Sequence, residues 1–164
     1  MAKEIERKFL VKDDGWRREA VSASDFVQAY VAAQEDRSLR VRLIDDRRAT
    51  LTIKIGRQLI SRDEFEYEIP VEDARELIGS ALGIVLEKTR HEVEHEGFVW
   101  EVDVYAGAYR GLVVAEVEME HEGQQPPLPA WVGLEVTGDR RFSNLVMATE
   151  DLSAELCHGL SHPA

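Results

Sequence analysis

The chain has 164 residues, 44% hydrophobic and 32% charged, which suits one globular domain with a core and excludes a disordered chain. Its net charge of −12 disfavours a broad contact with DNA or RNA, because the nucleic-acid backbone is also negative. A single cysteine, Cys157, permits no disulfide within the chain, and no apolar run approaches the roughly 18 to 20 residues of a membrane span. We therefore expect one domain over residues 1–164, soluble and cytoplasmic, with no nucleic-acid or membrane partner; a homodimer stays open.

Alternation of apolar and polar residues with period two predicts strands through the first half of the chain. Polar turns separate these segments, and the short spacing favours antiparallel meander connections. A short helix or turn is expected at 17–24. The predicted strands are 2–11, 25–33, 38–44, 49–55 and 62–69.

A helical pattern follows Pro70, with its apolar face at Ala74, Leu77, Ile78 and Ala81 and its end at Gly83. Three more strands are expected, the first two as a hairpin around Glu96-Gly97, and a proline-rich connection leads to a closing amphipathic helix. The strands are 84–97, 98–107 and 112–121, the connection is 122–130, and the helix is 142–160.

Charged side chains of the predicted strands share one face, and their signs are grouped by strand. The first strand places Glu4, Glu6 and Lys8 on that face. Three strands carry only bases at their central charged positions, namely Arg40, Arg42, Lys54, Lys88 and Arg90. Three others carry only acids, namely Glu64, Glu66, Glu68, Glu101, Asp103, Glu116, Glu118 and Glu120.

The simplest interpretation of such a face is the solvated side of an antiparallel sheet. A solvated face gains stability by mixing signs across neighbouring strands, however, because like charges directly opposite each other are destabilising. Grouping by sign therefore favours a site in which bases bind an anion and acids bind cations.

Eight strands can also close into a barrel with a narrow lumen that side chains nearly fill. Charges in that lumen would need water, counter-charges or a ligand, because burying lone charges is prohibitive. Clustered carboxylates are suited to magnesium or manganese, and arginine pairs with lysines are suited to phosphate. The combination predicts a metal–polyphosphate site. The sequence shows no nucleophile–base pair, so a covalent intermediate is not indicated.

Seven motifs, in order, resemble those of the CYTH domain family, also called triphosphate tunnel metalloenzymes. They are EIERKF, LRVRL, LTIK, RDEFEYEI, EKTR, WEVDVYAG and VVAEVEME, which together span nearly the whole chain. The segment EVTGDRRFSN is similar to the closing segment of short bacterial members, with Phe142 where tyrosine is usual. The family includes class IV adenylate cyclases, thiamine triphosphatases and inorganic triphosphatases.

The resemblance implies an α+β fold that is mainly β: a closed eight-stranded antiparallel barrel forming a tunnel, with a few helices packed outside. It implies that triphosphate is bound by Lys8, Arg40, Arg42, Lys54, Lys88 and Arg90. It implies metal ligation by Glu4, Glu6, Asp103, Glu116 and Glu118, with Glu64, Glu66 and Glu101 as nearby support.

Two further residues are candidates beside this set. Tyr30 corresponds to a tyrosine that short bacterial members place near the first-strand lysine, so Lys8 and Tyr30 are the predicted catalytic pair; an ordinary strand aromatic is the alternative for Tyr30. Arg141 is a further phosphate-binding candidate, and capping of the closing helix is its alternative.

The expected activity is hydrolysis of a triphosphate with Mg²⁺ or Mn²⁺ as cofactor, and inorganic triphosphate is the preferred small-molecule substrate. A class IV adenylate cyclase and a thiamine triphosphatase would use the same site on other substrates. A polyphosphate- or nucleotide-binding module without turnover is the alternative from a different class.

Overall fold

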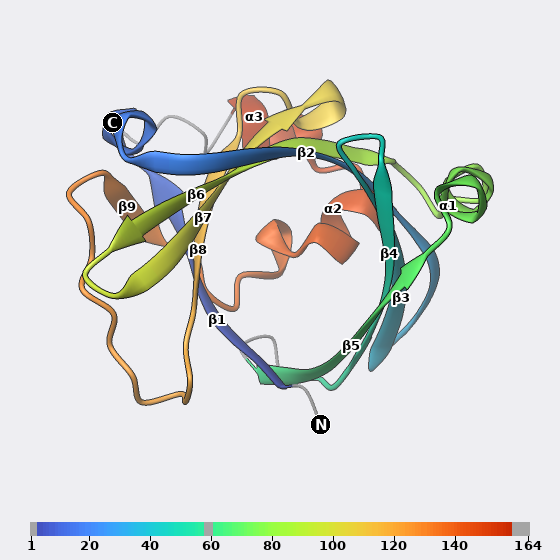
Figure 1. Cartoon of the computed structure of the whole chain (residues 1–164), viewed down its shortest axis with the longest axis horizontal. Helices are drawn as coiled ribbons and strands as arrows, with labels where there is room; N and C mark the ends of the chain where they lie inside the picture. Colours follow the sequence, from blue (N-terminus) through green and yellow to red (C-terminus); the bar gives the residue numbers. More distant parts are fainter. Residues whose placement is uncertain (1–2, 58–60, 159–164) are drawn as a thin grey trace.

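The computed structural model describes residues 3–57 and 61–158, so the ends of the predicted domain at 1–2 and 159–164 lie outside the described residues. Eight antiparallel strands form a closed ring, seen end-on in Figure 1, in the order β1-β5-β4-β3-β2-β6-β7-β8 and back to β1. The strands are β1 (Lys3–Val11), β2 (Ala20–Gln34), β3 (Arg37–Ile44), β4 (Arg48–Ile55), β5 (Ser61–Ile69), β6 (Leu86–His95), β7 (Phe98–Ala106) and β8 (Val113–Glu118). The predicted tunnel-like barrel is confirmed.

Closure of the ring depends on a short pairing between β1 and β5. Lys3 lies opposite Asp63, Glu4 opposite Arg62, and Ile5 opposite Ser61. The pairings β2–β6 and β1–β8 also join strands far apart in the chain, and the β1–β5 seam is the additional pairing that turns this sheet into a tunnel.

The ring places apolar side chains outside and charged ones inside. On the outer side, Phe9, Trp16, Trp100 and Trp131 are buried in one cluster beside the 3₁₀ helix η1 (Gly15–Arg18). The three tryptophans thus have a packing role on the outer side of the ring. A ring with charged side chains inside and apolar ones outside is possible because elements outside the ring cover the apolar faces of the strands.

The helix α1 (Val71–Ile78) is one of these covering elements and lies outside β3 and β4 in Figure 1. It follows Pro70 as predicted and buries Ala74 against Val41 and Leu43. It ends at Ile78, earlier than the predicted end at Gly83. Gly83 has a positive φ of 68° and lies where an added Cβ would collide with the carbonyl of Ala148, so it serves a close backbone approach.

The hairpin between β6 and β7 forms where the sequence predicts it. Glu96 and Gly97 both have positive φ, 47° and 84°, as a two-residue turn of type I′ requires. A ninth strand, β9 (Val132–Glu135), was missed: it pairs with the end of β1 outside the ring. Four residues after a proline-rich connection are too few for a period-two pattern to stand out.

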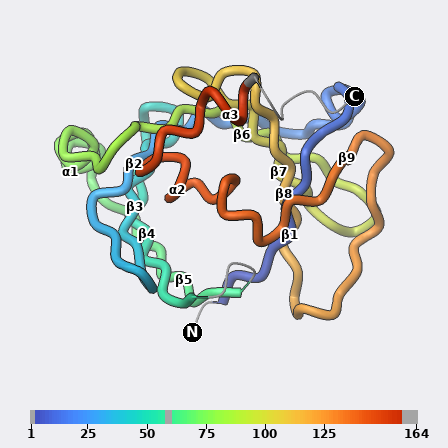
Figure 2. Tube along the Cα trace, turned by 180° about the vertical axis from the view of Figure 1, so that it is seen from behind, coloured from blue at the N-terminus to red at the C-terminus, as the bar shows by residue number. Residues whose placement is uncertain are grey.

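The predicted closing helix is instead three short elements: η3 (Arg140–Phe142), α2 (Asn144–Thr149) and α3 (Ser153–His158). The break between α2 and α3 is held by Tyr109, whose hydroxyl donates to the Met147 carbonyl and accepts from the Leu152 backbone N–H at 3.0 Å. Leu156 and Cys157 are buried beside them. In Figures 1 and 2 α2 projects over the centre of the ring, so this segment crosses one end of the tunnel.

Among the described residues, no helix is both long and apolar enough to cross a membrane.

Candidate active site

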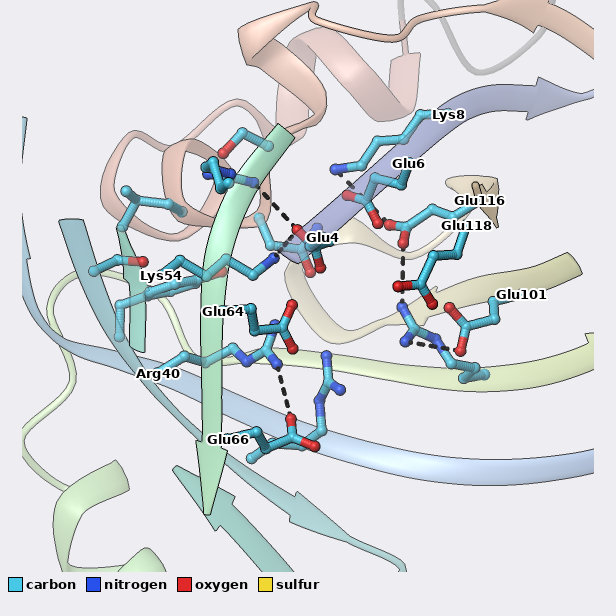
Figure 3. Close-up of a pocket in the computed structure, with 18 of the residues that line it drawn as sticks. Glu4, Glu6, Lys8, Arg40, Lys54, Glu64, Glu66, Glu101, Glu116 and Glu118 are labelled. Carbon is cyan, nitrogen blue, oxygen red and sulfur yellow. Dashed lines mark ion pairs between the residues drawn. The ribbon is translucent and has the colours of Figure 1, made fainter. Parts of the chain in front are cut away.

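A cavity of about 250 Å³ runs through the ring and is lined almost entirely by polar side chains. Its acidic lining is Glu4, Glu6, Glu64, Glu66, Glu101, Glu116 and Glu118. Its basic lining is Lys8, Arg40, Arg42, Lys54, Arg62, Lys88 and Arg90. Figure 3 shows the labelled members converging from several strands on one space.

The strand order converts the grouping by sign into two continuous walls. We call β4, β3, β2 and β6 the basic wall, because their charged lining residues are all bases. We call β7, β8, β1 and β5 the acidic wall, because they carry all the lining carboxylates. Lys8 on β1 and Arg62 on β5 are the two bases that the acidic wall contributes among the described residues.

Asp103 holds two bases in place from behind. Its Oδ2 accepts from Lys88 Nζ at 2.7 Å and from Arg90 at 2.9 Å, and its Oδ1 accepts from Arg90 Nε at 2.7 Å. Burial lowers the pKa of Lys88 to about 7, with Asp103 opposing and the two neighbouring guanidiniums adding to the shift. Asp103 is fully buried, does not line the cavity and is paired with the two bases, and its ligation of a metal stays a prediction.

Arg40 and Arg42 point into the cavity from β3. Arg42 Nε donates to Gln28 Oε1 at 2.9 Å, and its guanidinium lies 4.1 Å from the ring centre of Phe26. Burial, together with the charges of Arg40 and Arg90, lowers the pKa of Arg42 to about 9. Arg40 Nε is buried without a hydrogen-bond partner in the structure. Guanidinium groups held this way are suited to an anion with several oxygens.

The carboxyl groups of the acidic wall face one another in two pairs. Burial and the charge of Glu116 raise the pKa of Glu6 to about 8, and Glu6 and Glu116 share a hydrogen bond. Burial and a hydrogen bond to Glu4 raise the pKa of Glu64 to about 7. Against its own burial, the pKa of Glu4 is held at about 2 by Lys54, whose Nζ lies 2.9 Å from Glu4 Oε1.

Lys8 is a predicted phosphate-binding base that lies beside the predicted metal ligands. Its Nζ donates to the Phe142 carbonyl at 3.0 Å and lies 3.8 Å from Glu116 Oε1. Although burial favours the neutral amine, the carboxylates of Glu116 and Glu6 raise the pKa of Lys8, and Tyr30 adds to the shift. Tyr30 is buried and lines the same cavity as Lys8, and its catalytic role beside Lys8 stays a prediction.

Arg141 is outside this cavity. Its guanidinium donates to Asp139 and lies 3.4 Å from Glu155, so two carboxylates already occupy it. The side chain is 36% exposed. Ser143 lines the cavity whereas Arg141 of η3 does not, so phosphate binding by Arg141 stays a prediction that its position does not support.

Five lining residues were missed as site residues from the sequence: Ser38, Arg62, Ser143, Asn144 and Leu145. Ser38 and Arg62 share the period-two face of Arg40 and Glu64, so alternation was a usable signal for both. Arg62 NH2 lies 3.9 Å from Glu4 Oε1 across the seam that closes the ring. Ser143 and Asn144 carry no such signal, because they belong to the segment that crosses the tunnel end.

Comparison with known proteins agrees with this architecture. The model of the CYTH domain matches residues 2–143. An inorganic triphosphatase of Acetivibrio thermocellus is 44% identical over 149 residues, 89% of this chain and 94% of that protein. One of Nitrosomonas europaea is 34% identical, over 88% of this chain and 96% of the relative.

A solved structure of an inorganic triphosphatase has the same fold, with a TM-score of 0.65 and 33% identity over 91% of this chain and 96% of that one. The family model covers most of the chain, and the ring of eight strands with its charged lumen is present. The chain belongs to the CYTH domain family.

Proposed function

We propose that this protein is an inorganic triphosphatase that hydrolyses its substrate in the tunnel with a divalent metal. The observation that carries the proposal is the cavity lining, where seven bases and seven carboxylates meet and Tyr30 is the one aromatic side chain among the described residues. Such a lining suits a chain of phosphates and, with Leu145 as its one aliphatic residue among those described, offers little apolar surface for a nucleobase or a thiazolium ring. The two inorganic triphosphatases at 44% and 34% identity support the same substrate.

Triphosphatases of the CYTH family typically depend on a divalent metal. The residues present fit such an ion, because carboxylate oxygens are its preferred ligands and the acidic wall holds more of them than its bases neutralise. The raised pKa values of Glu6 and Glu64, each beside a second carboxyl group, support a cation at this wall, where it would relieve repulsion. We infer that Glu4, Glu6, Glu116 and Glu118 would hold Mg²⁺ or Mn²⁺.

The chain's own residues then have separate tasks. Arg40, Arg42, Lys54, Lys88 and Arg90 bind the non-reacting phosphate oxygens and offset their charge. Lys8, oriented by the Phe142 carbonyl and in the same cavity as Tyr30, contacts the phosphoryl group under attack. A carboxylate of the acidic wall orients the attacking water and accepts its proton. The terminal P–O–P bond breaks, and phosphate and pyrophosphate leave. A bound divalent cation would polarise the phosphoryl oxygens.

The test is release of phosphate from inorganic triphosphate, ATP and thiamine triphosphate with Mg²⁺ or Mn²⁺, with products resolved by chromatography. Release from inorganic triphosphate in strong preference to the other two is expected. Cyclic AMP with pyrophosphate from ATP would instead establish a cyclase. Tight binding without turnover of any of the three would establish a binding module.

Two broader expectations stay proposals. We infer one domain over residues 1–164, supported by a single ring of strands on which α1, α2 and α3 pack. The cytoplasm is the proposed location, supported by the single cysteine of the chain.

A further inference from the structure

The segment that crosses the tunnel end contributes an amide to the basic wall. Asn144, the first residue of α2, has its Oδ1 2.9 Å from Lys88 Nζ and 2.8 Å from Gln28 Nε2, and both groups donate to it. Its Nδ2 donates to the Tyr105 hydroxyl at 2.9 Å. Asn144 itself lines the cavity. A helix needed only to cover the tunnel would not require these contacts.

The cations at the two ends of this chain of hydrogen bonds determine the orientation of both amides. A lysine ammonium can only donate, so the Asn144 oxygen must face Lys88 and the nitrogen must face Tyr105. A guanidinium can also only donate, so Gln28 must present Oε1 to Arg42 Nε, which lies 2.9 Å away. The Gln28 amide nitrogen is thereby left facing Asn144, as the structure has it.

These hydrogen bonds lie where water does not compete. Gln28 is 0% exposed, Lys88 is 3% exposed, and Arg42 is 8% exposed. Buried hydrogen bonds to charged groups are strong, and a buried donor that loses its partner is costly. Movement of Asn144 would therefore disturb Lys88 directly and Arg42 through Gln28.

The contacts also decide which donors remain for a ligand. Of the three N–H bonds of Lys88, one is used by Asp103 and one by Asn144, which leaves one directed elsewhere. Arg42 uses Nε on Gln28, so its two terminal nitrogens are what it offers to the cavity. The wall thus presents a small set of donors in a fixed direction.

We propose that Asn144 is a positioning residue, which with Gln28 holds Lys88 and Arg42 in the geometry that binds triphosphate. The proposal rests on the triphosphatase function proposed above. It makes docking of α2 a condition for phosphate binding, although α2 follows the last predicted strand by more than 20 residues. Asn144 acts through these two bases and takes no part in bond breaking.

The test compares Asn144→Ala with Leu156→Ala, a matched control that loosens the same C-terminal packing from a fully buried site on α3 without touching the tunnel. For Asn144→Ala we expect kcat/KM for inorganic triphosphate to fall about 10- to 100-fold, mainly through KM. For Leu156→Ala we expect a larger drop in melting temperature with KM nearly unchanged. Asn144→Ser is a second variant. Serine is well tolerated at a helix start, so this variant should fold well, but the shorter serine side chain cannot reach Lys88.

A double-mutant cycle with Lys88→Ala separates positioning from general stability. If Asn144 acts through Lys88, Asn144→Ala should cost much less in the Lys88→Ala background than in the wild type. Additive losses, or losses of activity that track melting temperature in all variants, would overturn the proposal. Calorimetric binding of inorganic triphosphate gives the same comparison without turnover. A wild type that binds but does not hydrolyse would therefore refute the proposed function alone.

Discussion

In the basic wall of the tunnel each buried cation has a fixed hydrogen-bond partner, whereas in the acidic wall carboxyl groups face one another. Lys88 and Arg90 share Asp103, and Arg42 is held by Gln28. Glu6 and Glu116, by contrast, share a hydrogen bond that requires a proton. Among the described residues, no three acidic, histidine or cysteine side chains are close enough to hold a metal as they stand.

The two halves of the site therefore differ in how far the protein alone organises them for ligand binding. The half that binds anions is organised by the protein itself, so its binding geometry costs little at the moment of binding. The half that binds cations retains repulsion that a cation would remove. Four variants test whether the basic wall and the acidic wall differ in this way.

The largest effect is expected from Glu116→Gln, in the acidic wall. Glu116 Oε1 lies 3.8 Å from Lys8 and its Oε2 lies 3.7 Å from Arg90, so an amide of equal size keeps the fold but loses the charge that a metal needs. We expect metal-dependent phosphate release to fall by about 100-fold or more. Titration of Mg²⁺ at saturating triphosphate measures it. Glu120→Gln, at an exposed position outside the cavity, is the matched control. Unchanged turnover of Glu116→Gln would refute the site.

The next effect is expected from Arg40→Ala, in the basic wall. The guanidinium is almost fully buried; one terminal nitrogen donates to Thr52 Oγ1 at 3.3 Å and its Nε has no partner, so we assign its remaining donors to the substrate. Loss of a buried charged contact costs about 2–5 kcal/mol, so triphosphate binding should weaken at least about 30-fold. Calorimetry measures the affinity. Arg48→Ala removes an exposed arginine that is paired with Glu68, and it should leave affinity unchanged. Equal affinities for both variants would place Arg40 outside the binding site.

A smaller effect on stability is expected from Glu6→Gln. Burial and Glu116 raise the pKa of Glu6 from 4.5 to about 8, so between these values the folded state binds a proton that the unfolded state has released. Stability of the metal-free protein should therefore fall as pH rises through this range, and Glu6→Gln should reduce that fall. Each kcal/mol recovered at the upper pH raises the melting temperature by about 2–4 °C.

Melting temperatures across this pH range in the presence of a chelator measure the effect of Glu6→Gln. Mg²⁺ should restore the stability of the wild type at high pH and have little influence on the variant. If the stability of the wild type rises steadily from pH 4.5 to 8, the pKa of Glu6 is not raised in the folded state. The same substitution should reduce activity, because it removes a carboxylate from the acidic wall.

The smallest effect is expected from Arg141→Ala. Asp139 and Glu155 occupy the guanidinium outside the cavity, and exposed ion pairs contribute about 0–1 kcal/mol. We expect KM for triphosphate to change less than about threefold, with a small loss of stability. Steady-state kinetics beside Arg40→Ala measure the contrast. A KM as high as that of Arg40→Ala would support the prediction from the sequence that Arg141 binds phosphate.

Alternation along the chain was enough to predict the eight strands of the ring and the composition of the walls, although not β9 or the three short elements of the closing segment. Strict alternation in LRVRL or FVWEVDV commits successive side chains to opposite faces, so Arg40 and Arg42 had to lie together whatever the strand paired with. The type I′ turn at Glu96-Gly97 was predictable for the same local reason. Most of the candidate site followed from these strands, including the placement of Glu4, Glu6 and Lys8 on one face of β1.

Only the tertiary structure decided which charges meet. The pairing of β1 with β5 brings Arg62 to Glu4, and the register of β6 and β7 turns Asp103 toward Lys88 and Arg90. The break held by Tyr109 lets Asn144 reach the tunnel while Arg141 faces away. Such contacts join residues far apart in the chain, and their geometry depends on ring closure and packing, which no local pattern records.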